Sequence, residues 1–279
     1  MKSFTPIAAA VALVSALAAG NANADSFFWA VNQFQTIQKL NGDTGAVVDS
    51  FAVPFGSGSA ASIAVVGNIG YYTLLGNANV YKVDMTSHAA LGTAFTTIVG
   101  GYMNGITPDA SGHLWFAGGG SDPIREYDTA GTLLSSHAFP SAAGSYRDGS
   151  VVFGSFVVAN RGDQQGPYDK YDLPGANGAL TVNQLSFIGA GNGSNGIAFN
   201  GVNFYTSDEV AHKVSKWDIN GTFVSIANLA PGSRYENWTF ASQDIVAGIP
   251  EPETYALMFA GLVAVGYAAK RKNKAALTA

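Results

Sequence analysis

The chain contains no cysteine and few histidine or charged residues. Without cysteine, neither disulfides nor thiolate metal sites can form, so the fold depends on its core for stability. Only four of the 279 residues are histidine, and none forms a close ligand pair with another, which argues against a zinc site. Charged residues make up 12% of the chain, and the scattered lysines and arginines argue against a nucleic-acid partner.

The first 24 residues have the pattern of a secretory signal peptide. Lys2 opens this segment, an apolar run covers Ile7–Ala19, and Ala22-Asn23-Ala24 is a small-x-small cleavage motif. We therefore predict that signal peptidase cuts after Ala24. Residues 1–24 are then excluded from the arguments about the fold.

A second targeting pattern lies in residues 247–279. Pro250-Glu251-Pro252 holds the backbone extended, and the following run Tyr255–Ala269 contains no charge. Fifteen helical residues span about 23 Å, so a helix over about 254–269 is a marginal span for a ~30 Å hydrocarbon core. The helix precedes a basic cluster, which predicts a cytoplasmic end and an exported main domain. This cluster consists of Lys270, Arg271, Lys272 and Lys274.

Together, the proline motif, the apolar helix and the basic cluster resemble the PEP-CTERM sorting signal of Gram-negative bacteria. The resemblance covers roughly residues 247–274. It implies recognition by an exosortase, transient insertion into the inner membrane, cleavage near the motif, and delivery to the cell surface or the exopolysaccharide matrix. The alternative interpretation is an ordinary membrane anchor that is never cut.

The segment between the two targeting patterns, residues 25–246, is long enough for one sizeable core. It carries nine basic and 17 acidic residues, and therefore a net charge near −8, which also argues against binding to anionic membranes. Glycine is abundant, and aromatic and β-branched residues are frequent. This composition favours an all-β fold with many turns.

A repeated pattern divides this segment into five units. In each unit an apolar or aromatic residue at the end of a strand precedes Asp or Asn, then a turn, and then another strand. The five copies are Ile37–Ser50, Val80–Gly92, Ile124–Ser136, Tyr168–Thr181 and Val214–Ser225. A short aromatic strand precedes each copy, and a further strand precedes most of these. Each unit is therefore predicted to be a four-stranded antiparallel meander.

The spacing of the units predicts a β-propeller. The entrances of the predicted inner strands are 42 to 47 residues apart, a period typical of propeller blades. The first unit lacks an inner strand and the last has a surplus one, Trp238–Val246, so the two fragments should complete one blade and close five blades into a ring. In repeat pattern the chain resembles NHL and lyase-type bacterial propellers. A β-sandwich or a solenoid built of hairpins is the alternative.

Four polar residues occupy the same place in successive units, in the loops that lead into the predicted inner strands. They are Asn104, Asp148, Asn195 and Asn237. Equivalent positions meet around a pseudo-symmetric axis, so this ring of three amides and one carboxylate could hold Ca²⁺ through oxygen ligands or bind sugar hydroxyls. In the alternative interpretation the same side chains only cap tight turns.

The sequence contains no recognisable catalytic motif. There is no G-x-S-x-G elbow, no nucleophile with an obvious histidine base, and no paired-carboxylate motif with an identifiable acid. The leading hypothesis is therefore an exported binding or scaffolding protein of the cell surface or the exopolysaccharide. One alternative is a lyase or hydrolase acting on a carbohydrate or lactone, with a central Ca²⁺ in the ring. Another is a subunit whose propeller face docks a second protein.

Overall fold

The computed structural model describes residues 26–239, apart from residues 33–34, 56–59, 98–102, 119–121, 141–148, 163–164, 176, 192–193, 195, 209 and 232–234. The described residues belong to one compact unit and contain strands but no helix. Hence no helix in this part of the chain has the length and apolar character that crossing a bilayer requires. The predicted signal peptide, sorting motif and apolar helix lie outside the described residues.

The described strands form five four-stranded antiparallel sheets, which we call blades 1 to 5. Blade 1 consists of β20 (Tyr235–Thr239), β1 (Phe27–Asn32), β2 (Thr36–Asn41) and β3 (Val47–Ala52). Blade 2 consists of β4 (Ala60–Val66), β5 (Ile69–Leu74), β6 (Asn79–Asp84) and β7 (Ala90–Thr96). Blade 3 consists of β8 (Met103–Pro108), β9 (Leu114–Gly118), β10 (Ile124–Tyr127) and β11 (Leu133–His137). Blade 4 consists of β12 (Ser150–Phe153), β13 (Phe156–Gly162), β14 (Gln165–Asp172) and β15 (Thr181–Ile188). Blade 5 consists of β16 (Ile197–Phe199), β17 (Asn203–Asp208), β18 (Lys213–Asp218) and β19 (Phe223–Asn228).

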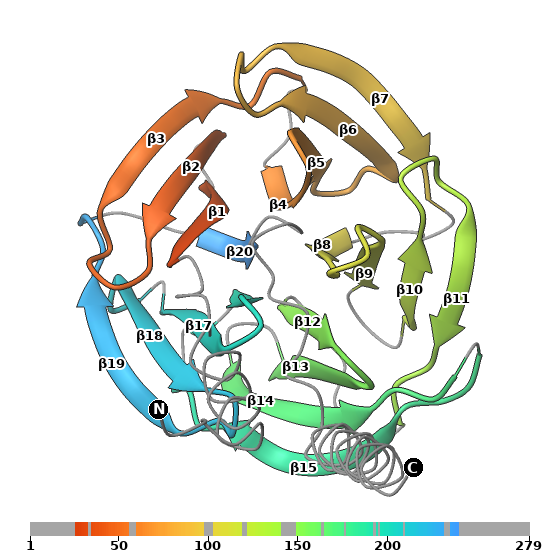
Figure 1. Ribbon diagram of the computed structural model, residues 1–279, viewed down its shortest axis with the longest axis vertical. Helices are drawn as coiled ribbons and strands as arrows, with labels where there is room; N and C mark the ends of the chain where they lie inside the picture. The colour runs from red at the N-terminus through yellow and green to blue at the C-terminus, as the bar shows by residue number, and fades with distance from the viewer. Residues whose placement is uncertain are drawn as a thin grey trace, which may run out of the picture. The chain divides into compact units, whose positions relative to one another are not determined.

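The predicted five-bladed β-propeller is confirmed. The blades surround a common centre, near which β20, β4, β8 and β12 lie, while β3, β7, β11, β15 and β19 form the rim (Figure 1). Within each of blades 2 to 5 the strands follow one another from the inside outward, as expected of four-stranded meanders. This ring arrangement excludes the sandwich and solenoid alternatives.

The predicted closure of the ring within blade 1 is also confirmed. The last described strand, β20, pairs antiparallel with the first, β1, with Trp29 opposite Thr239 and Ala30 opposite Trp238. The strand begins at Tyr235, earlier than the predicted start at Trp238. The reason is that Tyr235 is itself a core residue, 1% exposed, whose hydroxyl donates a hydrogen bond to Gln38 in β2.

The hydrophobic core consists of five clusters, one between each pair of neighbouring blades. Blades 5 and 1, for example, meet through a cluster in which the rings of Phe28 and Trp238 stack with centroids 4.5 Å apart. The repeated apolar residue that precedes each turn is buried in every blade, as predicted. These residues are Leu40, Val83, Tyr127, Tyr171 and Trp217.

The repeated Asp or Asn caps the turn between the two outer strands in four blades. In blade 1 the side-chain oxygen of Asn41 accepts hydrogen bonds from the backbone N–H groups of Asp43 and Thr44, each 2.9 Å long. Equivalent bonds fix the turns after Asp84, Asp128 and Asp218. Blade 4 departs from the prediction, because Asp172 instead accepts hydrogen bonds from two side chains of β15. The loop that follows Asp172 is longer than in the other blades.

Candidate functional site

The structure places only part of the predicted ligand ring. Asn104 lies in β8 and Asn237 in β20, and both are innermost strands of their blades. Asp148 and Asn195 lie outside the described residues. The same holds for the cleavage residues Ala22 and Ala24, for the motif Pro250-Glu251-Pro252 and for the basic cluster. The ring and the processing sites therefore stay predictions.

A polar cluster that the sequence analysis missed lies at the end of β8 remote from Asn104. We call it the blade 3 cluster, and its members are Asp109, His113 and Glu126. Asp109 and His113 flank the turn between β8 and β9, while Glu126 lies in the next strand, β10, opposite Trp115 of β9. Topology thus brings an aspartate, a histidine and a glutamate together, with one potential ligand atom of each within 4.8 Å of the others.

The turn itself holds Asp109 in place. One carboxylate oxygen, Oδ1, accepts hydrogen bonds from the backbone N–H groups of Ser111 at 2.8 Å and His113 at 3.0 Å. The other, Oδ2, accepts a 3.0 Å hydrogen bond from the indole N–H of Trp115. Gly112 completes the turn with φ of +82°, a conformation that other residues rarely adopt. The carboxylate therefore has an orientation determined by the backbone and a buried indole.

His113 contacts both carboxylates of the cluster. Its Nδ1 lies 2.7 Å from Oε1 of Glu126 and 3.9 Å from Oδ2 of Asp109. The His113 side chain is 39% exposed, whereas those of Asp109 and Glu126 are 20% and 17% exposed. The cluster is thus more open to solvent beside the histidine than around the two carboxylates.

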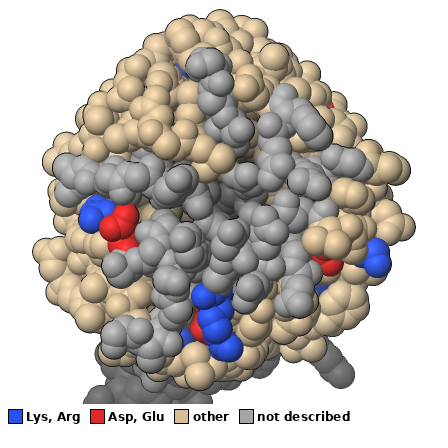
Figure 2. Space-filling model, turned by 180° about the vertical axis from the view of Figure 1, so that it is seen from behind, with Lys and Arg blue, Asp and Glu red and all other residues tan. Residues whose placement is uncertain are grey.

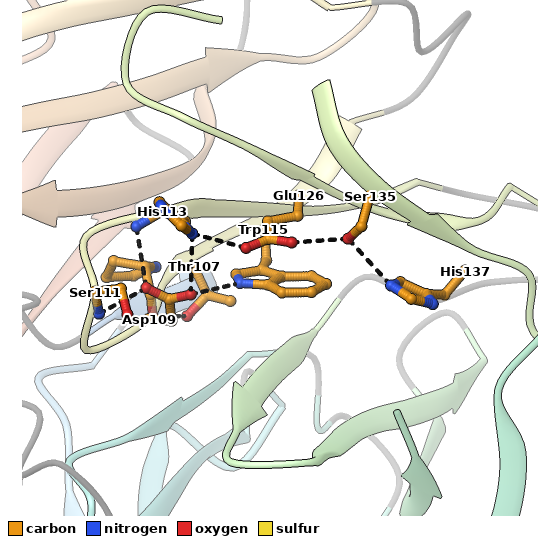
Figure 3. A network of polar contacts seen from close by, with 9 residues as sticks. Thr107, Asp109, Ser111, His113, Trp115, Glu126, Ser135 and His137 are labelled. Carbon is orange, nitrogen blue, oxygen red and sulfur yellow. Dashed lines mark hydrogen bonds and ion pairs between the residues drawn. The ribbon is translucent and has the colours of Figure 1, made fainter. Parts of the chain in front are cut away.

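Hydrogen bonds connect the blade 3 cluster through Ser135 to His137 (Figure 3), and His137 in turn contacts blade 4. The Ser135 hydroxyl donates to Oε2 of Glu126 at 2.8 Å and lies 3.1 Å from Nε2 of His137. Nδ1 of His137 lies 3.1 Å from the carbonyl oxygen of Gly178, in the loop between β14 and β15. Because a carbonyl can only accept, Nδ1 carries the hydrogen. The network therefore links β10 to β11 within blade 3, and blade 3 to blade 4.

This cluster contains neither a histidine pair nor a repeat position, the two patterns that would have indicated a site in the sequence. The cluster contains a single histidine, and Asp109 stands four residues before it, at a turn that does not follow the repeated Asp or Asn pattern. Glu126 comes 13 residues after His113 and meets it only through the pairing of β9 with β10. The Asp109-x-x-x-His113 spacing was the one signal available in the sequence.

Few of the described residues on the face shown in Figure 2 are charged. The described lysine, arginine, aspartate and glutamate side chains there form a few small groups in which both signs occur (Figure 2). No broad area of one charge lies among the described residues on this face. This distribution agrees with the scattered charges of the sequence.

Solved structures similar to this chain have low sequence identity to it. A chain from the structure titled "Crystal structure of Nidogen/Laminin Complex" is 12% identical, with a TM-score of 0.53 over 80% of this chain and 99% of that chain. Virginiamycin B lyase from Staphylococcus aureus is 12% identical, with a TM-score of 0.45 over 72% of this chain and 69% of that chain. The first of these similarities shows a shared propeller fold and nothing about activity. A search of curated proteins found no match.

The sequence profile described as "PEP-CTERM protein-sorting motif" matches residues 248–272. The match covers the proline motif, the apolar run and the first three residues of the basic cluster, which are the features that carried the resemblance in the sequence. The signal implies export and sorting to the surface by an exosortase. The chain is therefore an exported protein that joins a five-bladed β-propeller to a PEP-CTERM sorting motif.

Proposed function

We propose that this protein is a binding or scaffolding component of the cell surface or the exopolysaccharide matrix. The observation that carries the proposal is the PEP-CTERM motif at residues 248–272, which follows a closed propeller. A propeller offers two faces and a rim on a rigid core, and such a rigid scaffold suits binding loops. The sorting motif would bring these surfaces to the matrix.

The steps of export belong to the same proposal. Signal peptidase cuts after Ala24, and the apolar helix then holds the chain in the inner membrane with Lys270–Lys274 in the cytoplasm. Exosortase cuts near Pro250-Glu251-Pro252 and releases the propeller to the surface. The charge-free run Tyr255–Ala269 and the basic cluster after it support this order of events.

The sorting step is tested by replacing all three motif residues with alanine in the full chain. We expect the wild-type protein to appear at the surface in a shortened form, and the variant to remain uncut in the membrane fraction. Glu253→Ala, which removes a neighbouring charge outside the motif, is the matched control and should be sorted normally. Equal surface delivery of the triple variant would refute this role of the motif.

The binding role needs a separate experiment. Sorted wild-type protein should co-sediment with exopolysaccharide purified from the producing cells, and cells that lack the protein should retain less matrix. Normal sorting without co-sedimentation and without a matrix defect would contradict the scaffolding role while leaving the sorting step intact. The two parts of the proposal can thus fail independently.

We also propose that the ring of Asn104, Asp148, Asn195 and Asn237 contributes a ligand site for Ca²⁺ or sugar hydroxyls. Support comes from two of its members, since Asn104 and Asn237 belong to inner strands that approach one another, β8 and β20. Calcium should raise the melting temperature of the wild-type protein, and Asp148→Asn should abolish this shift because it removes the only carboxylate of the ring. Asp163→Asn, a substitution outside the ring, should keep the shift. An unchanged calcium response in Asp148→Asn would contradict the site.

A further inference from the structure

We propose that the blade 3 cluster is a binding site for one divalent transition-metal ion of the Zn²⁺ class. Asp109, His113 and Glu126 would each supply one ligand atom, and solvent or an exogenous ligand would complete the coordination. The inference is independent of the surface role proposed above and of the predicted calcium ring. It rests on the distances, the charges and the supporting hydrogen bonds of the cluster.

The distances between the ligand atoms are close to those of a zinc site. In a tetrahedral site with bonds of about 2.0–2.1 Å, neighbouring ligand atoms lie about 3.3 Å apart. In the cluster, Nδ1 of His113 lies 2.7 Å from Oε1 of Glu126 and 3.9 Å from Oδ2 of Asp109. For these two pairs, movements of roughly half an ångström would bring the atoms to the spacing of a bound ion.

The charges of the cluster also favour a cation. Asp109 and Glu126 are two largely buried carboxylates, and the ion pairs that the described residues form with them all involve His113. A single histidine cannot balance two carboxylates, even when it is protonated. A divalent ion would balance both charges and leave His113 as a neutral ligand, the form in which imidazole binds metals.

Both carboxylates are already oriented by hydrogen-bond donors around them. The Trp115 indole and two backbone N–H groups hold Asp109, and the Ser135 hydroxyl holds the second oxygen of Glu126. Ser135 in turn contacts His137, which is 1% exposed and bonded to Gly178 of blade 4. Hydrogen bonds of this kind to ligating carboxylates are typical of protein metal sites.

The kind of donor selects the class of metal. An imidazole nitrogen suits Zn²⁺ and its first-row neighbours, whereas Ca²⁺ and Mg²⁺ prefer oxygen donors alone. Three protein ligands leave at least one position open, and the 39% exposure of His113 places that position toward solvent. A site of this form can hold a water molecule or an anionic group from a partner.

The proposal is tested with the purified full chain in detergent, after removal of metals with a chelator. Titration calorimetry should show one Zn²⁺ per chain, and the melting temperature should rise with the zinc concentration. Co²⁺ should give visible absorption bands of a low-symmetry site. His113→Gln and Glu126→Gln should each weaken Zn²⁺ binding at least about tenfold and abolish the Co²⁺ bands.

The matched control is His88→Gln. His88 also lies beside a carboxylate, at 3.3 Å from Asp49, but no third ligand joins that pair among the described residues. This control should bind zinc as the wild type does. His113 is partly exposed, so His113→Gln should melt like the wild type in chelator, which shows that it is folded. Absence of stoichiometric zinc binding, or equal binding by the wild type and both cluster variants, would overturn the proposal.

Discussion

Lys216 of blade 5 and Asp43 of blade 1 form an ion pair across the junction at which the propeller closes. Nζ of Lys216 lies 2.8 Å from Oδ1 of Asp43, although 173 residues separate them in the chain. Burial by itself raises the pKa of Asp43, but hydrogen bonds from Lys216 and Ser26 and the positive charge of Lys216 outweigh it, so the pKa is lowered from 3.8. An ion pair between blades 5 and 1 thus adds to the pairing of β20 with β1 that closes the ring.

Asp43→Asn is expected to destabilise the protein slightly at neutral pH and less in acid. Because folding lowers the pKa of Asp43, its contribution is present above the ordinary value of 3.8 and is lost as the pH falls through the lowered pKa. The Asp43 side chain is 47% exposed, so solvent screening limits the effect to about 1 kcal/mol or less. Urea unfolding at pH 7 and pH 3 measures the difference. A double-mutant cycle with Lys216→Met should show a coupling energy at pH 7, and zero coupling there would refute the prediction.

The turn aspartates Asp84, Asp128 and Asp218 should make the propeller sensitive to acid. Backbone N–H groups, foremost those of Ser87, Thr132 and Thr222, lower the pKa of these carboxyls from 3.8. Their stabilising effect is therefore complete above that value and disappears as the pH falls through the lowered pKa values.

Replacing all three turn aspartates with asparagine tests this explanation. Asn41 already caps the same turn in blade 1, so asparagine keeps the acceptor and removes the titration. The melting temperature of the triple variant should fall less between pH 6 and pH 3 than that of the wild type. Asp128→Ala, which removes the acceptor, should instead melt a few degrees lower at both pH values. An acid dependence equal to that of the wild type would show that these carboxyls are not responsible.

Trp238→Ala should open the closed blade. Trp238 is fully buried in β20, and its ring stacks on Phe28 of β1 and packs edge-on against Tyr235. Removing a buried tryptophan costs about 3–5 kcal/mol, and here the loss falls on the pairing that closes the ring. Phe223→Ala at the rim, where the side chain is 52% exposed, should have a much smaller effect in the same chemical denaturation. Equal losses for the two variants would argue against a special role for β20.

Ser135→Ala should weaken the contact between blades 3 and 4. The hydroxyl bridges Glu126 and His137, and its removal leaves two largely buried groups short of a partner. The expected loss of unfolding free energy is about 1–3 kcal/mol. Ser136→Ala is the matched control, because the described interaction of Ser136 with Asn177 uses its backbone N–H. Unfolding free energies that agree between the two variants would contradict a bridging role.

Much of the architecture could be predicted from local patterns. Each blade repeats an apolar residue, a turn-forming Asp or Asn and a strand, and the predicted inner strands begin 42 to 47 residues apart, so the sequence shows the number of blades. The same pattern showed that the first unit lacks an inner strand and that the last unit has a surplus one. In the structure the surplus strand, β20, pairs with β1 and completes blade 1. Strand ends were harder to predict, because Tyr235 belongs to the sheet through a contact with Gln38 in another strand.

The targeting motif, the all-β class and the five repeats are visible in the sequence, because each depends on residues that are close together along the chain. Which distant side chains meet becomes known only from the folded chain. His113 and Glu126 come together through the register of β9 and β10, and Asp43 meets Lys216 because the last blade packs against the first. Contacts of this kind depend on the orientation of whole blades, which no local pattern of residues encodes.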